Sequence, residues 1–503
     1  MAHPSSSVAS AAELLAAPFA TVSDLVRAHA RERPAHIALL QDDAAGLRSI
    51  DYGTLDARMD AIAARLQREG LVPGGTVALC ASNSVEYAVV FLAILRAGGV
   101  AVPLSTSATP ESLERMRADA GSAYLLRERD LADWMATPRA SPMPVRIEPD
   151  APFNIIYSSG TTGEPKGIVQ PHRMRWMHIQ RGAKLGYDAA AVTLLSTPLY
   201  SNTTLVSFFP TIAVGGTAVL MAKFDVEHFL ALAQRHRVSH AMLVPVQYQR
   251  FMAFPRFDAY DLSAFRLKTA TSAPFAAALK AEVVRRWPGR LVDTYGLTEG
   301  GGTCLLDCTA HPDKLHTVGR PAEGHDIRLL DDDGHEVPPG QPGEVVGHSA
   351  GMMLGYHGRS DLTTAIEWRD ATGKRFLRTG DVGRFDGAGF LSLVDRKKDL
   401  VISGGFNIYP SDLEAVLRQH PDVVDASVVG VPSAEWGETP VAFVVVRSVA
   451  VPDAIREWAN ARLGKSQRIS SVEPIDALPR SPIGKVLKRE LRDRWIAEQP
   501  TRG

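Results

Sequence analysis

Hydrophobic and polar positions alternate early in the chain between a helical and an extended pattern. Apolar residues recur at helical spacing between Leu55 and Leu66, with charged residues on the other faces. An apolar strand is predicted at 77–81, an apolar helix at 85–96 and a second strand at 100–104. A strand, a helix and a strand joined by short turns form a βαβ unit, whose strands are parallel. The pattern therefore predicts an α/β fold.

The same alternation returns further along the chain. Strands are predicted at 219–221, 241–244, 268–271 and 291–294, and helices at 226–236 and 274–287. After about residue 325 the pattern changes to short strands separated by Gly, Asp and Pro turns, which is typical of a small β-rich subdomain. Such strands are predicted at 326–330, 343–347 and 389–394.

The last hundred residues form a separate pattern. Helices are predicted at 411–420 and 454–463, with apolar strands at 423–431 and 441–446 between them. The charged stretch Asp395–Asp399 precedes this part and is the expected hinge. We therefore predict a large N-terminal domain, residues 1–397, made of parallel α/β sheets and the β-rich subdomain. A small mobile α+β C-terminal domain is predicted at residues 398–503.

Composition excludes several classes of protein. Of the 503 residues, 45% are hydrophobic and 22% are charged, which is the profile of a globular protein rather than a disordered or fibrous one. The formal net charge of −1 gives no electrostatic footprint for nucleic acid. Three cysteines are too few for a disulfide framework and indicate a reducing compartment. No targeting segment is recognised, so a cytoplasmic protein is expected.

One uncharged stretch resembles a membrane span in hydropathy alone. Residues 189–222 carry no charge, but they include Pro198, Pro210 and a cluster of hydroxyl and amide side chains. A buried helix followed by a buried strand fits this stretch better, and no membrane span is predicted.

A loop of hydroxyl and glycine residues follows the strand-like segment 153–156. Its backbone N–H groups and hydroxyls could wrap phosphate oxygens, and Lys166 would add a positive charge for the same anion. Pro165 stands where the GxxxxGK[ST] loop needs glycine, so this is not that motif. By composition alone a surface turn explains the segment as well. The residues expected at the phosphates are Ser158, Ser159, Gly160, Thr161, Thr162 and Gly163.

This loop resembles the phosphate loop of the adenylate-forming superfamily, which contains acyl- and aryl-CoA synthetases, peptide-synthetase adenylation domains and beetle luciferases. Four further segments resemble motifs of that superfamily in the same order, and the likeness covers nearly the whole chain. They are Tyr295–Glu299, Arg378–Asp381, Asp395–Pro410 and Pro479–Lys485. Five ordered motifs make a chance match very unlikely. The resemblance is closest to the AMP-forming carboxylic acid:CoA ligases.

The resemblance implies a site for ATP and Mg²⁺. Thr298 would bind the α-phosphate and Glu299 the Mg²⁺, a cation that prefers oxygen ligands. Asp381 would accept hydrogen bonds from the ribose hydroxyls. The other residues implied to bind the nucleotide are Tyr295, which would pack on adenine, Gly296, Ser272, Ala273, Pro274 and Arg396.

The C-terminal motifs imply catalytic and coenzyme A roles. Lys485 resembles the catalytic lysine of adenylation, whose ammonium would bridge the substrate carboxylate and the α-phosphate as charge builds up. Lys398 falls at the pivot of the small domain. Gly404 and Gly405 would line the tunnel for the thiol, where glycines allow close backbone approach, and Trp436 is a candidate wall for coenzyme A. Ordinary packing within the small domain explains Trp436 equally well.

The acid substrate is expected between two segments. One is Tyr200, Ser201 and Asn202, and the other is Gly300, Gly301 and Gly302, which would leave the pocket floor open. The first segment carries no acidic residue, whereas relatives that activate amino acids place an Asp there for the amine. Many CoA ligases carry His where this chain has Ser201 or Asn202, a departure that counts against the usual aromatic or His gate beside the carboxylate. A mostly apolar tail is expected, on either a fatty or an aryl acid.

Three hypotheses follow from these residues. The first is an acid:CoA ligase that uses ATP, Mg²⁺ and coenzyme A, acts on a small carboxylic acid and exists as a monomer or homodimer. The second is an acyl-AMP ligase that loads a separate carrier protein; because the chain ends soon after Lys485, a fused carrier is not expected. The third is a non-catalytic nucleotide or acyl-CoA binding module, which would not need Lys485, Glu299 and Asp381 together.

Two other chemistries are disfavoured. Cys304, Cys308, His311 and His316 are potential zinc ligands, but their spacing does not match the common zinc patterns. They are expected to be pocket-wall and loop residues. The sequence contains no G-x-S-x-G elbow and therefore gives no case for a hydrolase.

Overall fold

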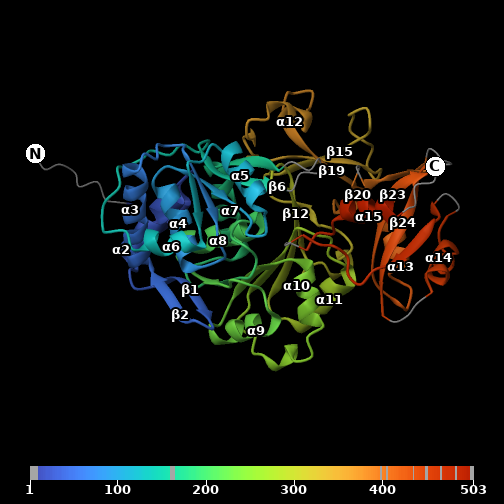
Figure 1. Cartoon of the computed structure of the whole chain (residues 1–503), viewed down its shortest axis with the longest axis horizontal. Coiled ribbons are helices and arrows are strands. Elements are labelled where there is room, and N and C mark those ends of the chain that lie inside the picture. The colour runs from blue at the N-terminus through green and yellow to red at the C-terminus, as the bar shows by residue number, and fades with distance from the viewer. Residues whose placement is uncertain are drawn as a thin grey trace, which may run out of the picture. The chain divides into compact units, whose positions relative to one another are not determined.

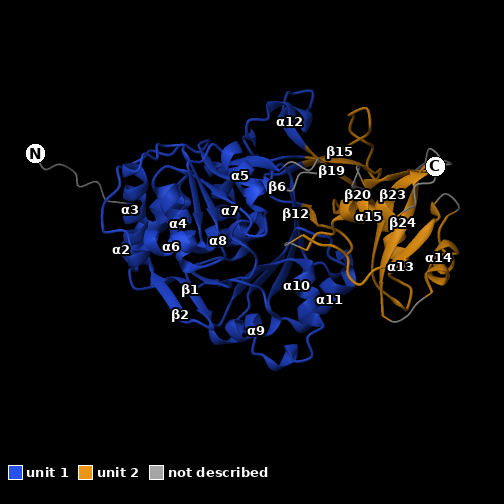
Figure 2. Cartoon of the chain, in the orientation of Figure 1, with its two compact units in different colours: residues 1–315, 321–326, 347–377 blue, residues 316–320, 327–346, 378–503 orange. Residues whose placement is uncertain are grey.

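The computed structural model of the chain (Figure 1) describes residues 9–158, 165–396, 399–403, 406–433, 436–447, 451–464, 467–481 and 484–498. The chain forms two compact units (Figure 2): residues 1–315, 321–326 and 347–377 in unit 1, and residues 316–320, 327–346 and 378–503 in unit 2. The predicted boundary between residues 397 and 398 separates a fixed domain from a mobile one. The division into compact units does not test which segment moves. The boundary stays a prediction.

Four strands run from one unit into the other, so the units are not simply successive stretches of chain. These strands are β14 (Arg320–Pro321), β15 (Asp326–Leu330), β16 (Gly343–His348) and β19 (Arg375–Phe385). All of them lie in the part of the sequence where short strands and turns were predicted.

Unit 1 contains two sheets with mostly parallel strands. In the first, the order is β14-β13-β12-β11-β10-β8-β9-β1-β2. It is parallel from β12 to β1, whereas β13 pairs antiparallel with β12 and β2 with β1. Its strands are β1 (Ile37–Asp43), β2 (Gly46–Asp51), β8 (Val192–Leu195), β9 (Thr217–Leu220), β10 (His240–Leu243), β11 (Leu267–Ala270), β12 (Arg290–Gly296) and β13 (Thr303–Asp307).

The second sheet has the order β17-β7-β6-β4-β3-β5. The strands from β6 to β5 are parallel, whereas β7 pairs antiparallel with both β6 and β17. Its strands are β3 (Thr76–Cys80), β4 (Val100–Pro103), β5 (Tyr124–Arg127), β6 (Pro152–Ser158), β7 (Lys166–Pro171) and β17 (Gly355–Tyr356). The strand β18 (Glu367–Arg369) pairs with the beginning of β19.

The βαβ prediction is confirmed by β3, α4 and β4. Helix α4 (Val85–Arg96) begins where predicted, because the Ser84 side chain accepts a hydrogen bond from the Tyr87 N–H. Every residue of α4 except Glu86 is buried, so its apolar sequence fits a helix enclosed on all sides. The α/β class with a large N-terminal and a small C-terminal part is confirmed.

Of the other helices of unit 1, α1 and α2 precede β1, and the rest lie between strands along the chain (Figure 1). They are α1 (Ala11–Ala16), α2 (Val22–Glu32), α3 (Tyr52–Arg68), α5 (Pro110–Asp119), α6 (Glu128–Met135), α7 (His172–Leu185), α8 (Asn202–Ala213), α9 (Val226–Arg235), α10 (Pro245–Met252), α11 (Ala277–Arg286) and α12 (Ser360–Ala365).

Helix α11 starts later than the predicted 274–287. Ala276 is still extended, with φ −61° and ψ 137°, so Pro274 and Phe275 lie before the helix. The Phe275 ring stacks on Tyr248 with the ring centroids 5.1 Å apart. This contact holds the segment out of the helix, and the prediction for its first three residues was wrong.

The uncharged stretch 189–222 folds as β8, α8 and β9, so a strand precedes the predicted helix and strand. Helix α8 is almost entirely buried and contains Pro210. Among the described residues, none of the helices combines the length and the apolar character that crossing a bilayer requires.

A further sheet has the order β15-β16-β19-β18, and β20 (Leu391–Arg396) pairs with β19. Unit 2 also contains a sheet with the order β22-β21-β24-β23, in which β25 lies beside β24. The apolar pattern of the long antiparallel strands β23 and β24 supplies the core, which includes Val428, Ala442 and Val444. The elements of this part are β21 (Val401–Ser403), β22 (Phe406–Ile408), α13 (Pro410–Leu417), β23 (Val423–Ser433), β24 (Gly437–Val446), α14 (Pro452–Asn460), β25 (Ser471–Pro474) and α15 (Lys488–Glu498).

Candidate active site

The predicted phosphate loop connects two neighbouring antiparallel strands. Ser158 ends β6 and lies opposite Lys166, the first residue of β7. The Lys166 Nζ lies 5.4 Å from the centroid of the Tyr356 ring. Residues 159–164, with the predicted ligands Ser159, Gly160, Thr161, Thr162 and Gly163, lie outside the described residues. The loop therefore closes a hairpin, and its phosphate role stays a prediction.

The segment Tyr295–Glu299 carries four of the predicted ligands: Tyr295 and Gly296 end β12, and Thr298 and Glu299 follow it. The Tyr356 hydroxyl donates to the Glu299 Oε1 over 2.9 Å, and the Met353 N–H donates to the Glu299 carbonyl over 2.8 Å. Burial and the Glu299 charge raise the pKa of Tyr356, so this phenol stays a donor. Tyr356, which the motif analysis did not identify, thus holds the Glu299 carboxylate in place.

The glycines after Glu299 have a packing reason for being glycine. Gly300 and Gly301 have φ of +83° and +82°, in the left-handed region. A Cβ on Gly300 would collide with the Gly351 carbonyl oxygen, and one on Gly301 would lie 2.9 Å from the Gly347 oxygen. The backbone therefore passes too close for any side chain. Whether Gly300, Gly301 and Gly302 also floor the acid pocket stays a prediction.

The acid-pocket segment Tyr200–Asn202 leads into α8, whose first turn contacts a predicted nucleotide segment. Ser201 caps α8, and its side chain accepts a hydrogen bond from the Thr203 N–H over 3.3 Å. The Thr203 Oγ1 lies 2.6 Å from the Ser272 Oγ, in the segment predicted to border adenine and the acyl group. Ser272 adopts φ of +81°, which is unusual for a residue with a side chain. The structure thus brings the first turn of α8, directly after Ser201, to Ser272.

A network of buried polar side chains joins the acid segment to the nucleotide segment. The Gln170 Nε2 donates to the Thr298 carbonyl over 2.6 Å and lies 3.4 Å from the Asn202 Oδ1. Arg175 donates to the Asn202 Oδ1 over 2.8 Å. Sequence reasoning missed Gln170 and Arg175. Neither segment carries a signal for them, because α7 is rich in other polar residues and Thr298 lies 128 residues from Gln170.

In unit 2, the predicted ribose ligand Asp381 lies within β19 and is buried. Its N–H donates to the Thr379 Oγ1 over 3.0 Å, and its Cα lies opposite that of Arg396 on β20. The Thr379 Oγ1 in turn donates to the Val345 carbonyl over 2.8 Å. Strand pairing therefore places two of the predicted nucleotide ligands side by side in the backbone register.

Lys485 lies in a tight turn of unit 2. Its N–H donates to the Ser481 Oγ over 3.2 Å, and the Ser481 N–H donates to the Lys485 carbonyl over 2.8 Å. Gly484 has φ of +79°, which the turn requires. Trp436 is 52% exposed, and its role as a wall for coenzyme A stays a prediction. Lys398, Gly404 and Gly405 lie outside the described residues.

The cysteines are structural. Cys304 and Cys308 are fully buried, and burial raises the pKa of both thiols. Among the described residues, the group whose carboxylate and imidazole atoms converge within 4.8 Å is the exposed set Asp331, Asp333 and His335, which the zinc pattern did not include.

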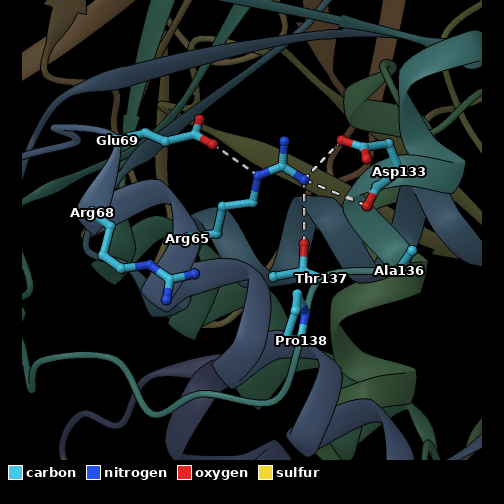
Figure 3. A pocket seen from close by; sticks show the side chains of 7 residues that line it. All are labelled: Arg65, Arg68, Glu69, Asp133, Ala136, Thr137 and Pro138. Carbon is cyan, nitrogen blue, oxygen red and sulfur yellow. Dashed lines mark hydrogen bonds and ion pairs between the residues drawn. The ribbon is translucent and has the colours of Figure 1, made fainter.

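A surface pocket lies between α3 and α6 and is unrelated to these segments. In Figure 3 its Arg65 lies between Glu69 and Asp133, at ion-pair distances of 2.8 and 2.9 Å. Arg65 also donates to the Thr137 Oγ1 over 3.4 Å and stacks on Trp134 at 4.1 Å. The residues that line the pocket include none of the predicted site residues. The guanidinium of Arg65 is already bound by Glu69, Asp133 and Thr137. The pocket therefore belongs to the helix packing.

Comparison with known proteins agrees with this arrangement. Residues 26–357 match the AMP-binding enzyme family, and residues 412–485 match the AMP-binding enzyme C-terminal domain. A feruloyl-CoA synthase from Amycolatopsis is 33% identical over 90% of this chain and 95% of its own. A fatty acid–[acyl-carrier-protein] ligase, ScoC from Streptomyces coeruleorubidus, is 30% identical over 93% of this chain and 95% of its own.

A solved structure has the same fold. The crystal structure of ATP-bound MatB from Rhodopseudomonas palustris superposes with a TM-score of 0.83 at 28% identity. The match covers 95% of this chain and 99% of that one.

Proposed function

The chain belongs to the AMP-binding enzyme family, and we infer that it joins a carboxylic acid to coenzyme A with conversion of ATP to AMP and pyrophosphate. The predicted enzyme class, an AMP-forming acid–thiol ligase, is confirmed by the family and by relatives such as the feruloyl-CoA synthase. The observation that supports the reaction best is the contact of the acid segment with the nucleotide segments, through Thr203 with Ser272 and through Gln170 with Thr298.

In the first step, a carboxylate oxygen of the acid attacks the α-phosphorus of ATP. The bond from that phosphorus to the bridging oxygen breaks, acyl-AMP forms and pyrophosphate leaves. Such a reaction needs positioning and charge stabilisation more than a protein nucleophile. The Thr298 hydroxyl would bind the α-phosphate, and Lys485 would stabilise the charge that develops there.

Magnesium fits the residues at Glu299. Its carboxylate supplies a hard oxygen ligand, and Tyr356 orients it through the Oε1, which leaves the Oε2 for the cation. Bound Mg²⁺ would neutralise phosphate charge. The remaining nucleotide contacts proposed are those of Tyr295, Asp381, Arg396 and the loop 158–163.

In the second step, the coenzyme A sulfur attacks the acyl-AMP carbonyl carbon. AMP leaves with the bonding electrons, and the thiol proton is lost. We propose that the small domain, residues 398–503, turns about Lys398 between the steps, so that Lys485 withdraws and Gly404 and Gly405 line the thiol tunnel. The exposed Trp436 would pack against coenzyme A.

The acid is proposed to be an aryl or a fatty acid. One relative makes feruloyl-CoA and another loads fatty acids onto an acyl carrier protein. The second relative also favours one alternative function, transfer of the acyl group to a separate carrier protein. Thioester formation on coenzyme A, compared with that on an acyl carrier protein under the same conditions, distinguishes the two.

We also propose a cellular location and an oligomeric state for the protein. Cys80, Cys304 and Cys308 are free thiols, which supports a reducing, cytoplasmic compartment. A monomer or a homodimer is proposed.

The test is a panel of short, medium and long fatty acids and aryl acids, read by pyrophosphate release. The wild type should release pyrophosphate with at least one of them. Lys485→Ala should lower acid-dependent release by about a hundredfold or more, while acyl transfer from preformed acyl-AMP to coenzyme A is retained.

The matched control is Lys488→Ala, in the same segment, whose ammonium pairs with Glu414 at 2.9 Å. It should retain both steps. Equal loss of both half-reactions in Lys485→Ala would contradict the division of labour between the two steps.

A further inference from the structure

The orientation of the Asn202 amide is set by its neighbours. Its Oδ1 accepts from the Arg175 Nη1 over 2.8 Å and from the Gln170 Nε2 over 3.4 Å. A guanidinium only donates, so the amide atom that faces it must be the oxygen. The Nδ2 group therefore points away from Arg175. Among the described residues it makes no hydrogen bond, and Asn202 is partly exposed.

Arg175 is fully committed to this network. Its Nε and Nη2 donate to the Asn154 Oδ1 over 3.2 and 2.9 Å, Nη2 also to the Gln170 Oε1, and Nη1 contacts the His178 Nδ1 over 3.4 Å. Its side chain is 1% exposed. Within the described part of the chain, none of its acceptors is a carboxylate, so its charge is not neutralised locally.

Arg175 also fixes the orientation of the Gln170 amide, which contacts the nucleotide segment at Thr298. Its Oε1 accepts from Arg175 and from the Asn154 Nδ2, the latter over 3.0 Å. Its Nε2 must then face the Thr298 carbonyl, to which it donates over 2.6 Å. One arginine thus fixes two amides, one beside the predicted acid pocket and one beside the predicted α-phosphate ligand.

We propose that Asn202 binds the carboxylate of the acid substrate through its Nδ2–H groups, and that Arg175 is the positioning residue that holds this amide in place. The proposal rests on the proposed function. The Nδ2–H groups would hold the carboxylate oxygen that does not attack phosphorus, which leaves the other oxygen directed at the α-phosphate. The nearby unneutralised Arg175 charge favours an anion at this place.

The decisive variant is Asn202→Asp, which keeps the side-chain shape and its bond to Arg175. It removes both N–H donors and turns a negative charge toward the substrate carboxylate. The acid KM should rise at least tenfold, and the ATP KM should stay within twofold. If Asn202 had a purely structural role, the acid KM would not change. Stability would be kept, because an Asp–Arg pair is stronger than an Asn–Arg hydrogen bond.

Arg175→Lys tests the positioning role. Lysine offers three donors without the planar fork and cannot hold all the amides. The acid KM should rise at least fivefold while the ATP KM stays within twofold. The matched control is Arg96→Lys, another buried arginine, whose partners Asp56, Asp60 and Ser23 are not site residues. It should lower the melting temperature without changing the acid KM.

Acid binding is also measured by calorimetry, with ferulate and octanoate as probes and a non-hydrolysable ATP analogue present. This separates the two proposals. Lack of pyrophosphate release by the wild type with every acid, together with binding that Asn202→Asp abolishes, would refute the ligase and keep the inference. An Asn202→Asp variant that binds both probes as the wild type does would overturn the inference, as would Arg175→Lys raising both KM values alike.

Discussion

Two buried arginines of unit 1 are satisfied in opposite ways. Arg96, the last residue of α4, donates to the carboxylates of Asp56, over 2.7 Å, and Asp60. Arg175, on α7, donates to the side-chain oxygens of amides and contacts one imidazole. The first arrangement is a local ion pair, and the second leaves a buried positive charge with its donors satisfied.

With the role proposed for Arg175, one residue type serves stability in one place and function in the other. Carboxylates around Arg96 cancel its charge and tie α3 to α4. Neutral amides satisfy the Arg175 donors without cancelling the charge, at the cost of its desolvation. Burial lowers the pKa of Arg175 to about 9, so it is still charged at neutral pH. Such an arrangement suits a place where the substrates themselves are anions.

The largest effect is expected from converting the Arg175 arrangement into the Arg96 type. In Gln170→Glu, a carboxylate would pair with Arg175, and the donor to the Thr298 carbonyl would be lost. The kcat/KM for acid-dependent pyrophosphate release should fall about tenfold to a hundredfold, or roughly 1.4–2.7 kcal/mol. Steady-state kinetics of the acid panel measures this change.

The control for Gln170→Glu is Gln247→Glu. Gln247 is also buried, with its Nε2 donating to the Ser196 Oγ over 3.1 Å and its Oε1 accepting from the Val244 N–H. This variant should lose stability and keep its kinetic constants. Unchanged kcat/KM in Gln170→Glu would show that the amide network does not act on the site.

A moderate effect is expected from the converse change at Arg96. Asp60→Asn removes the charge that faces Arg96 and Arg27, the latter at 2.6 Å. Stability should fall by about 1–2 kcal/mol, a shift of roughly 1–4 °C in melting temperature, because Asp56 still pairs with Arg96. Thermal unfolding measures the loss. Acid and ATP KM values altered beyond twofold would contradict a purely structural Arg96 cluster.

The smallest effect expected is the pH dependence of stability. Arg175 contacts a buried histidine, His178, whereas Arg96 contacts carboxylates. Burial, reinforced by Arg181 and Arg175, holds the pKa of His178 well below its usual value. Burial also lowers the pKa of His172 to about 4. Burial and the nearby charge of Arg181 lower the pKa of His325 to about 4 as well. Between pH 6.5 and 4 the unfolded chain binds more protons than the folded one, so stability falls as pH falls.

The melting temperature should therefore drop when the pH is lowered from 7.5 to 5. His172→Phe should make this drop smaller, since the ring packs against Phe153 at 4.8 Å and one proton-binding group is removed. An equal slope in the variant and the wild type would show that His172 does not contribute.

The fold was largely predictable where a pattern is local. Helix α4 has the predicted ends because its apolar run and its Ser84 cap lie within the segment itself. The hairpin β6–β7 was not predicted, because the strands flank a loop whose composition suggested only turns. The start of α11 was wrong because Phe275 packs against Tyr248, a contact that the local pattern does not contain.

The site divides in the same way. Thr298, Glu299 and Lys485 could be predicted as site residues because each lies in a contiguous motif. Gln170 escaped notice because its partner Thr298 lies 128 residues further along the chain. Tyr356 lies 57 residues from Glu299. A polar residue buried by distant partners has no signature in its own segment, so only the structure identifies it.

The most direct measurement of the central claim is acid-dependent exchange of labelled pyrophosphate into ATP without coenzyme A. It reports acyl-AMP formation alone. The wild type should catalyse exchange with at least one aryl or fatty acid, and Lys485→Ala should not. Absence of exchange with every acid, in wild-type protein that binds ATP, would contradict adenylation by this chain.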